Sequence, residues 1–247
     1  MSLVYPLTFL DMLQRLHFET GTSGVSPSSV TGQTDQISRL VMWLSTAWVE
    51  IQSAHQDWDY LRATATFATV AGQGVYTRAN CGITAGTFGK WIPWTFRNYL
   101  TTAGITNETY MDMTEYDAWR NQYQYGALRN VQTRPFIIAV APDKSLCLGP
   151  FPNALYTIIG DYFIAPQPLL ADADTPTSVS ASVGAGGSKG EIPTQWNMAI
   201  VYKAMLSYGT YESAPDTFKR GKDGYEEVIQ QLDHDRIPQC RVGGALA

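Results

Sequence analysis

Residues 36–61, QISRLVMWLSTAWVEIQSAHQDWDYL, carry the strongest structural signal in the chain. Apolar residues recur in this stretch at intervals of three and four, which places them on one face of a helix over four turns. These residues are Ile37, Leu40, Val41, Leu44, Ala47, Trp48 and Ile51. The pattern predicts a helix from about residue 35 to residue 54, with Thr34 or Asp35 as its N-terminal cap.

Three further segments near the two ends of the chain have helical spacing. They cover residues 7–18, 194–213 and 216–234. The segment 194–213 is apolar around most of its circumference, which is typical of a helix buried centrally or in a subunit interface. In the last segment, Gly221 and Gly224 each lower helix stability by about 1 kcal/mol relative to alanine.

The middle of the chain favours β-strands. Residues 62–77 are rich in Thr, Val and aromatic side chains and contain a Gly-Gln-Gly turn. Three short β-prone runs follow Pro135, and we expect them to form an antiparallel meander. The runs are 136–141, 145–149 and 155–164. Between these regions, residues 113–127 can form a helix with Thr114 as its cap.

We therefore predict an α+β fold, in which helices from both ends form a helical bundle and an antiparallel β region is inserted between them. The bundle is assigned to residues 1–61 and 191–238, and the β-rich region to residues 62–170. Residues 171–190 have almost no bulky apolar side chain and many Gly and Ser, so we expect a flexible loop there. The last residues, 239–247, are expected to form a flexible tail.

The composition excludes several classes of protein. With 247 residues, 45% hydrophobic residues and a net charge of −5, the chain is typical of a folded protein and lacks the basic excess of nucleic-acid binders. Only 16% of residues are charged, so much of the surface is expected to be uncharged or covered by a partner. Cys81, Cys147 and Cys240 are odd in number and widely spaced, which excludes a disulfide scaffold. We expect no signal peptide and no membrane span.

Motifs for catalysis and ligand binding are weak. His55, Asp57 and Asp59 form an HxDxD string that can be imagined as a metal site. A polar corner between a helix and a strand fits the string better, because no second His lies nearby in the sequence. The Gly-rich stretch at 184–190 does not match a phosphate-binding loop, and no GxSxG nucleophile motif occurs. The sequence therefore predicts no catalytic residue, no metal and no cofactor.

Trp48 and Trp196 lie on predicted core faces of the helices, whereas Trp91 and Trp94 do not. Trp91 and Trp94 occur in the string KWIPWTF, and tryptophan is enriched in protein interfaces. They are candidates for a subunit interface. The arginines are scattered and form no basic stripe, so specific DNA recognition is not supported.

Several segments resemble the head-to-tail adaptor proteins of tailed bacteriophages. Residues 36–61 are similar to the second helix and the following corner of that family, and residues 146–166 are similar to its strand, Pro-rich turn and strand. Other positions that fit the family pattern are Tyr116, Arg134, Pro135, Leu169, Asp172, Asp174, Pro176, Ile192, Pro193, Trp196 and the stretch 200–215. The long stretch 80–110 and the Gly/Ser segment 178–190 depart from the pattern.

The resemblance implies a non-enzymatic structural protein of the virion, located at the head–tail junction and assembled in the host cytoplasm. Such adaptors form a ring, usually of twelve subunits, beneath the portal protein. The ring extends the DNA channel, lets genomic DNA pass without sequence-specific binding, and supports the tail or a further neck protein. We expect interface contacts at Trp91, Trp94, Arg236, Ile237, Pro238, Arg241, Val242 and Leu246.

Two other functions stay open on the sequence alone. A tail tubular ring protein of a short-tailed phage would share the fold and differ in its neighbour. A phage hydrolase would need a clustered polar site, and the presence of only 3 His argues against one.

Overall fold

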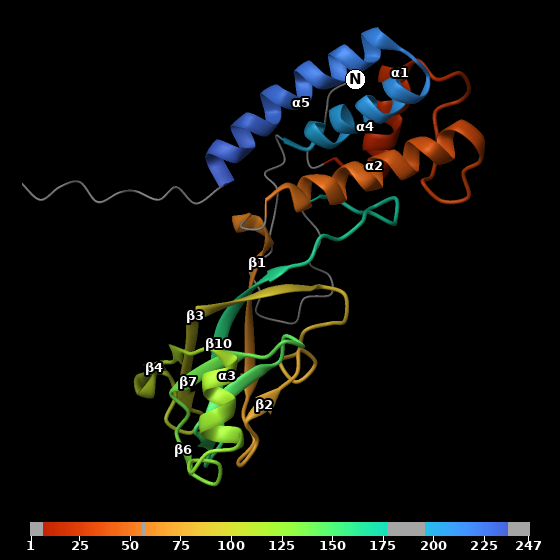
Figure 1. The fold of residues 1–247 in the computed structure, drawn as a ribbon. Helices are drawn as coiled ribbons and strands as arrows, with labels where there is room; N and C mark the ends of the chain where they lie inside the picture. Colours follow the sequence, from red (N-terminus) through yellow and green to blue (C-terminus); the bar gives the residue numbers. More distant parts are fainter. Residues whose placement is uncertain (1–6, 56–57, 177–195, 237–247) are drawn as a thin grey trace, which may run out of the picture. The chain divides into compact units, whose positions relative to one another are not determined.

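The computed structural model describes residues 7–55, 58–176 and 196–236. The described chain is α+β, as predicted, and it divides into two compact units (Figure 1). The helical unit contains the described residues before Arg62 and after Ala165, and the β unit contains Arg62–Ala165.

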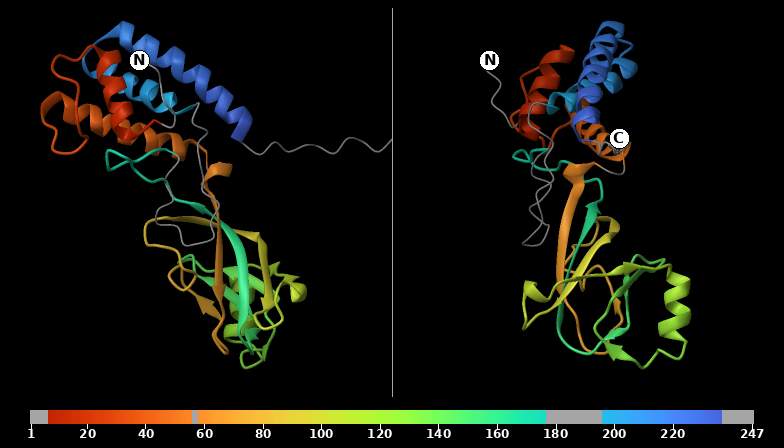
Figure 2. Two further views of the ribbon diagram at one scale, coloured as in Figure 1. Left: turned by 180° about the vertical axis from the view of Figure 1, so that it is seen from behind. Right: turned by 90° about the vertical axis from the view of Figure 1, so that its left-hand side faces the viewer.

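The helical unit is built from four helices and a short turn. The helices are α1 (Phe9–Thr20), α2 (Asp35–Ala54), α4 (Met198–Tyr211) and α5 (Pro215–Arg236), and the 3₁₀ turn η1 (Asp59–Leu61) follows α2. Helix α4 contacts the other three, which explains why its sequence is apolar on nearly every side (Figure 2). The predicted bounds of α2 are confirmed. Thr34 occupies the cap position of α2, although its side chain makes no capping hydrogen bond.

Glycines allow α4 and α5 to approach each other closely. A Cβ atom on Gly221 would lie 2.9 Å from the carbonyl oxygen of Tyr202, and one on Gly209 would lie 2.7 Å from Cβ of Phe218. Neither site has room for a side chain. Helix propensity alone makes Gly221 a cost to α5, whereas in the structure Gly221 makes room for the backbone of α4.

The N-terminus of α1 is tied to the segment that follows the β unit. The backbone N–H groups of Phe9 and Leu10 donate to the carbonyl oxygens of Asp174 and Asp172, at 2.7 and 3.2 Å. These bonds satisfy two donors that a helix leaves unpaired in its first turn. Residues 171–176 of the predicted flexible loop are thus held against α1, and the rest of that loop lies outside the described residues.

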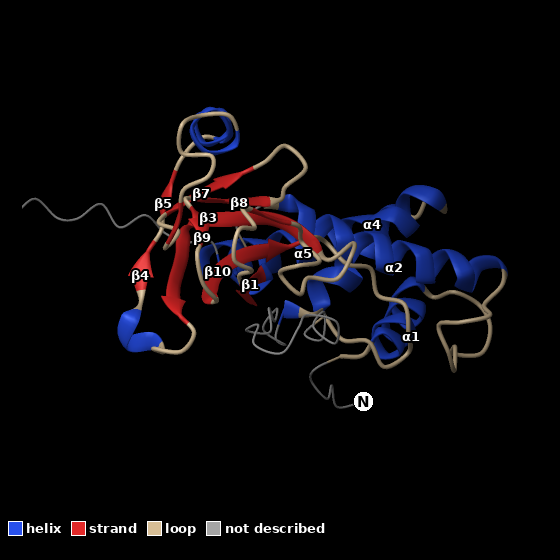
Figure 3. Cartoon of the chain, turned by 90° about the horizontal axis from the view of Figure 1, so that it is seen from below, coloured by secondary structure: helices blue, strands red, loops and turns tan. Residues whose placement is uncertain are grey.

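The β unit contains two four-stranded sheets and a two-stranded pair (Figure 3). The first sheet has the antiparallel order β1 (Arg62–Ala68), β10 (Tyr156–Ile164), β3 (Phe88–Leu100) and β4 (Thr109–Tyr110). The second has the order β2 (Val75–Tyr76), β8 (Leu146–Gly149), β7 (Ile137–Val140) and β5 (Asp112–Met113). Strand β5 runs parallel to β7, and β6 (Gln132–Thr133) runs parallel to β9 (Phe151–Pro152).

The predicted antiparallel meander is wrong in its pairing. Strands β7 and β8 do form an antiparallel pair, but β10 lies between β1 and β3 in the other sheet. Likewise, the predicted strand region 62–77 divides into β1 and β2, which belong to different sheets. An alternating pattern specifies which face of a strand is buried, and it does not specify the strand's partner.

The predicted helix at 113–127 is shorter than expected and is not capped by Thr114. Its helical part is α3 (Tyr116–Trp119), which continues as a π-helical turn, η3 (Arg120–Gln124). The N–H of Thr114 instead donates to the carbonyl oxygen of Ile138 at 2.9 Å, so residue 114 still belongs to the edge of the second sheet. The pairing of the preceding residues with β7 fixes where α3 can begin.

Candidate interaction surfaces

An irregularity in β3 presents Trp94 to solvent. The register of β3 against β10 moves from Ile92 opposite Asp161 to Arg97 opposite Ile159, so the residues between them bulge out of the ladder. The bulge is fixed by Thr95, whose hydroxyl donates to the carbonyl oxygen of Ile92 at 2.7 Å and accepts from the N–H of Asp161 at 2.8 Å. Bulges re-aim side chains. Trp94, within this bulge, is 73% exposed.

The two candidate tryptophans of the sequence analysis have different environments. Trp91 is only 6% exposed, its indole N–H donates to the carbonyl oxygen of Lys144 at 2.7 Å, and its ring packs against Phe88, Phe96 and Tyr162. The Trp91 side chain is therefore almost fully buried by contacts within the β unit. Trp94 is the one of the pair whose side chain is available to a partner.

Arg134 is fully engaged within the β unit. Its Nε donates to Oδ1 of Asn98 at 2.7 Å, and its Nη1 donates to Oδ1 of Asn107 at 3.0 Å. Its Nη2 donates to the carbonyl oxygens of both asparagines, at 2.7 and 2.5 Å. Asn98 is completely buried, and its amide donates to the carbonyl oxygen of Pro135 at 2.6 Å. Arg134 thus holds the end of β3 and is not free to bind an external anion.

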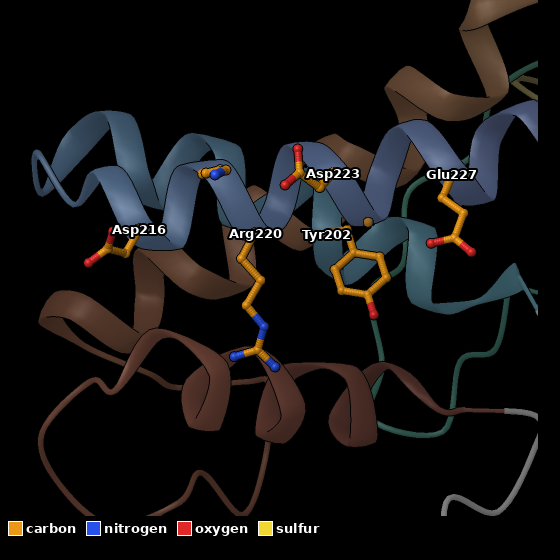
Figure 4. A pocket seen from close by; sticks show the side chains of 7 residues that line it. Tyr202, Asp216, Arg220, Asp223 and Glu227 are labelled. Carbon is orange, nitrogen blue, oxygen red and sulfur yellow. The ribbon is translucent and has the colours of Figure 1, made fainter.

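An open pocket of about 420 Å³ lies on the helical unit, between α4 and α5 (Figure 4). Its lining is mostly charged and consists of Tyr202, Asp216, Lys219, Arg220, Asp223, Gly224 and Glu227. Figure 4 shows Asp216, Asp223 and Glu227 along α5, with the Arg220 side chain pointing away from that helix toward α1. A polar, open pocket of this kind suits a protein side chain better than an apolar small molecule.

The charge of Arg220 is neutralised by α1. Its Nη2 lies 2.6 Å from Oε2 of Glu19, and Nη2 of Arg15 lies 2.5 Å from Oε1 of the same carboxylate. Oε2 also counts among the buried atoms that lack a well-aligned hydrogen bond, so the contact is an ion pair of imperfect angle. The Glu19 side chain is only 1% exposed. The other charged groups of the pocket, on Lys219 and the three acidic residues, make no ion pair with any part of the chain that is described.

The HxDxD string does not assemble a metal site among the described residues. Nε2 of His55 lies 3.3 Å from Oδ1 of Asp233 on α5, and the His55 ring packs edge-on against Trp58 at 4.8 Å. Asp57 lies outside the described residues. No group of three or more potential metal ligands occurs within residues 7–55, 58–176 and 196–236. His55 therefore links the C-terminal ends of α2 and α5.

The two described cysteines are buried and free. Burial raises the pKa of the Cys81 and Cys147 thiols to about 12. Because the thiolate is the nucleophilic form, both side chains are chemically inert near neutral pH. They act as small packing groups in the β unit.

The remaining predicted interface residues lie at the C-terminal end. Arg236 is the last residue of α5 and the last one described, whereas Ile237, Pro238, Arg241, Val242 and Leu246 lie outside the described residues. None of the helices that the structure describes is long and apolar enough to cross a membrane.

Comparison with protein families supplies the identification. The family model of the SU10 adaptor protein matches residues 7–239, a range that takes in both units. The chain belongs to this family. SU10 adaptors are a phage head-to-tail adaptor family, so the predicted resemblance is confirmed. No curated protein matches the chain.

Membership of the adaptor family gives the protein a coarse role. Adaptors are components of the virion and interact with other head or tail proteins, and the family is typically structural rather than enzymatic. The positions that carried the resemblance prove to be framework residues: α2 forms part of the helical core, Arg134 fixes the end of β3, and Asp172 binds α1. Their contacts maintain the fold of the two units.

Proposed function

We propose that this chain forms a ring of twelve copies that joins the portal protein to the tail or to a further neck protein. Genomic DNA passes through the ring without sequence-specific binding. The observation that carries this proposal is the match to the adaptor family over residues 7–239. The helical units lie side by side around the axis in this arrangement.

Exposed apolar side chains on the β unit support the proposal. Isolated exposed apolar residues are ordinary, but several large ones on a small unit favour an interaction surface. On the β unit they are Val70, Val75, Trp94, Ile105, Tyr110, Met113, Tyr125, Leu128, Val131, Phe136 and Leu155. In a ring, contacts with neighbouring proteins cover part of this surface.

Trp94 is the best candidate for an anchor in such a contact. The Thr95 hydroxyl fixes the backbone of the bulge by hydrogen bonds to Ile92 and Asp161, so little backbone ordering is needed when Trp94 binds a partner. Tryptophan is also among the residues that contribute most to interface energies. The C-terminal residues 236–247 are proposed as a second contact, which orders on the portal or on the next ring.

The test is assembly of the full chain with the purified portal protein, followed by electron microscopy of the complex. We expect a closed ring of the chain on the portal. Trp94→Ala is expected to weaken the assembly by tenfold or more, since loss of an interface anchor costs about 2 kcal/mol or more. Val25→Ala, at an apolar site of the helical unit that is 88% exposed, is the control. Absence of the chain from purified virions would contradict the proposal.

Deletion of residues 237–247 tests the second contact separately. We expect the shortened chain to keep its thermal stability, because the deletion leaves every described element intact, and to bind the portal more weakly. Full portal binding by the shortened chain would remove the C-terminal residues from the proposed function.

A further inference from the structure

One segment of the β unit is exposed along nearly its whole length and carries only positive charge. Residues 120–131, here called the arginine segment, contain Arg120 and Arg129 and no carboxylate. Tyr125 is 59% exposed, and Leu128 and Val131 are also exposed. A surface of this composition fits a partner that is acidic and offers some apolar contact.

The arginine segment has a fixed shape. It begins on the π-helical turn η3, whose Tyr123 is buried so tightly that a Cβ on Gly149 would lie 2.5 Å from its ring. Three backbone hydrogen bonds close the following turns, from Tyr125 to Arg120, from Arg129 to Gly126 and from Val131 to Leu128. A preformed surface loses little conformational entropy when it binds.

The two arginines of the segment make no ion pair with any described residue. Arg120 stacks on the Tyr125 ring at 5.0 Å and donates to its hydroxyl at 3.2 Å. It makes no ion pair with any described residue, although the Asp117 carboxylate lies three residues before it in the chain. Arg129 makes no ion pair with any described residue. Both guanidinium groups can therefore pair with carboxylates of a partner.

The helical unit of the same chain offers the complementary surface. Asp216, Asp223 and Glu227 line the pocket on α5 without ion pairs to the described residues, and Tyr202 of α4 lines the same pocket. Since Glu19 neutralises Arg220, Lys219 is the one cation of the pocket that is not already paired. Phe218 on the same helix is partly exposed and supplies apolar surface. We call this surface the acidic face of α5.

The unequal charge of the two units points to a second copy as the occupant. Acidic side chains clearly outnumber basic ones in the helical unit, while basic side chains slightly outnumber acidic ones in the β unit. Complementary potentials of this kind orient partners and fix their register. We propose that the arginine segment of one copy docks on the acidic face of α5 in a second copy.

Such a contact joins two different surfaces, so it is heterologous. Heterologous contacts generate closed rings when the rotation between copies closes, whereas a two-fold contact would stop at a dimer. The proposal therefore rests on the proposed ring function and specifies which surfaces meet at each subunit boundary.

Crosslinking between two variants of the full chain tests the contact. One variant carries Leu128→Cys and the other carries Glu227→Cys, both with Cys240→Ser, and the two are mixed with a short bismaleimide. Each copy has one new thiol, so a mixed dimer reports contact between copies and not within one. The buried Cys81 and Cys147 contribute little. Lys222→Cys replaces Glu227→Cys in the control, because position 222 points away from the acidic face.

We expect the mixed dimer with Glu227→Cys to form several-fold faster than the control dimer. Arg129→Glu and Asp223→Arg should each lower its yield several-fold, and the two reversals together should restore it. Equal yields at positions 227 and 222, no mixed dimer in free or portal-bound protein, or insensitivity to both reversals would overturn the proposal. A DNA gel shift that Arg129→Glu abolishes, with unchanged crosslinking, would assign the segment to DNA instead. Portal binding is measured in parallel. If the chain crosslinks as expected but does not bind the portal, the proposed function is refuted and the proposed contact between copies is kept.

Discussion

The guanidinium of Arg220 lies 2.6 Å from the carboxylate of Glu19, and this contact joins α5 to α1. The Glu19 side chain is almost fully buried, and Arg15 holds its other oxygen from one turn away on the same helix. Each arginine, in contrast, keeps part of its surface in solvent. Loss of either arginine therefore destabilises the fold mainly through Glu19, because the buried carboxylate cannot be solvated by water in place of its lost partner.

Removal of Arg220 should destabilise the helical unit. We expect Arg220→Leu to lower the free energy of unfolding by about 1–3 kcal/mol, since it leaves a buried carboxylate oxygen without its counter-charge. Lys222→Leu is the matched control, because Lys222 pairs with Glu226 at 3.7 Å on the exposed surface and such pairs contribute little. Urea unfolding of the two variants measures the difference. Equal losses would show that the Glu19 pair is no stronger than a surface pair.

The close approach of α4 and α5 predicts that Gly221 cannot be replaced. Alanine gains about 1 kcal/mol of helix propensity over glycine, yet its methyl group would meet the Tyr202 carbonyl oxygen at 2.9 Å. Since backbone cannot yield easily, we expect Gly221→Ala to be destabilising by about 1–3 kcal/mol. Gly224→Ala meets only the Tyr202 ring, at 3.0 Å, and should be better tolerated because that ring can turn. A Gly221→Ala protein with a higher melting temperature than wild type would disprove the tight packing.

Arg134 should not be replaceable by lysine. Its planar guanidinium binds Asn98 and Asn107 through all three nitrogens, a geometry that an ammonium group does not reproduce. We expect Arg134→Lys to lower the free energy of unfolding by about 1–3 kcal/mol. Arg129→Lys, at an exposed position of the same unit, should change it by less than about 0.5 kcal/mol. Denaturant unfolding followed by tryptophan fluorescence checks both values, and similar losses would contradict the assigned role of Arg134.

The buried thiols predict a loss of stability in alkali. Burial raises the pKa of Cys147 to about 12, whereas a thiol in the unfolded chain titrates at about 8.5. Between these values the unfolded state has lost a proton that the folded state keeps, so stability falls as pH rises above about 8.5. Unfolding free energies measured from pH 7 to pH 10 should decline, and the decline should be shallower in Cys147→Ala. Rapid alkylation of the native Cys147 by iodoacetamide at pH 8 would argue against its burial.

The sequence predicted elements more successfully than it predicted pairing. Helix α2 was located correctly because one apolar face persists over its full length, and no tertiary partner is needed to see that pattern. Strand β3 was missed because Gly89 and Pro93 interrupt it, and the bulge around Trp94 breaks its alternation. The sheet order was missed because the partners of β10 lie far away in the sequence.

Interaction residues were predictable only in part. Trp91 and Trp94 look equivalent in the sequence, and only the bulge determines that one is buried and the other exposed. The link between Arg220 and Glu19 had no sequence signal, because the two residues come from opposite ends of the chain. The absence of carboxylates within residues 120–131 was visible in the sequence, but its meaning depends on the exposure of that segment.

The central position of α4 has a consequence for biosynthesis. Helices α1 and α2 leave the ribosome first, yet α4, against which both pack, begins only at Met198. At a translation rate of about 5–20 residues per second, α4 is synthesised on the order of ten to thirty seconds after the first two helices, whose apolar faces lack their α4 contact until then. The β unit is contiguous through Arg62–Ala165 and can complete its sheets during this interval. We therefore expect the β unit to fold before the helical unit, and the apolar faces within the first 54 residues to be the segment that chaperones shield.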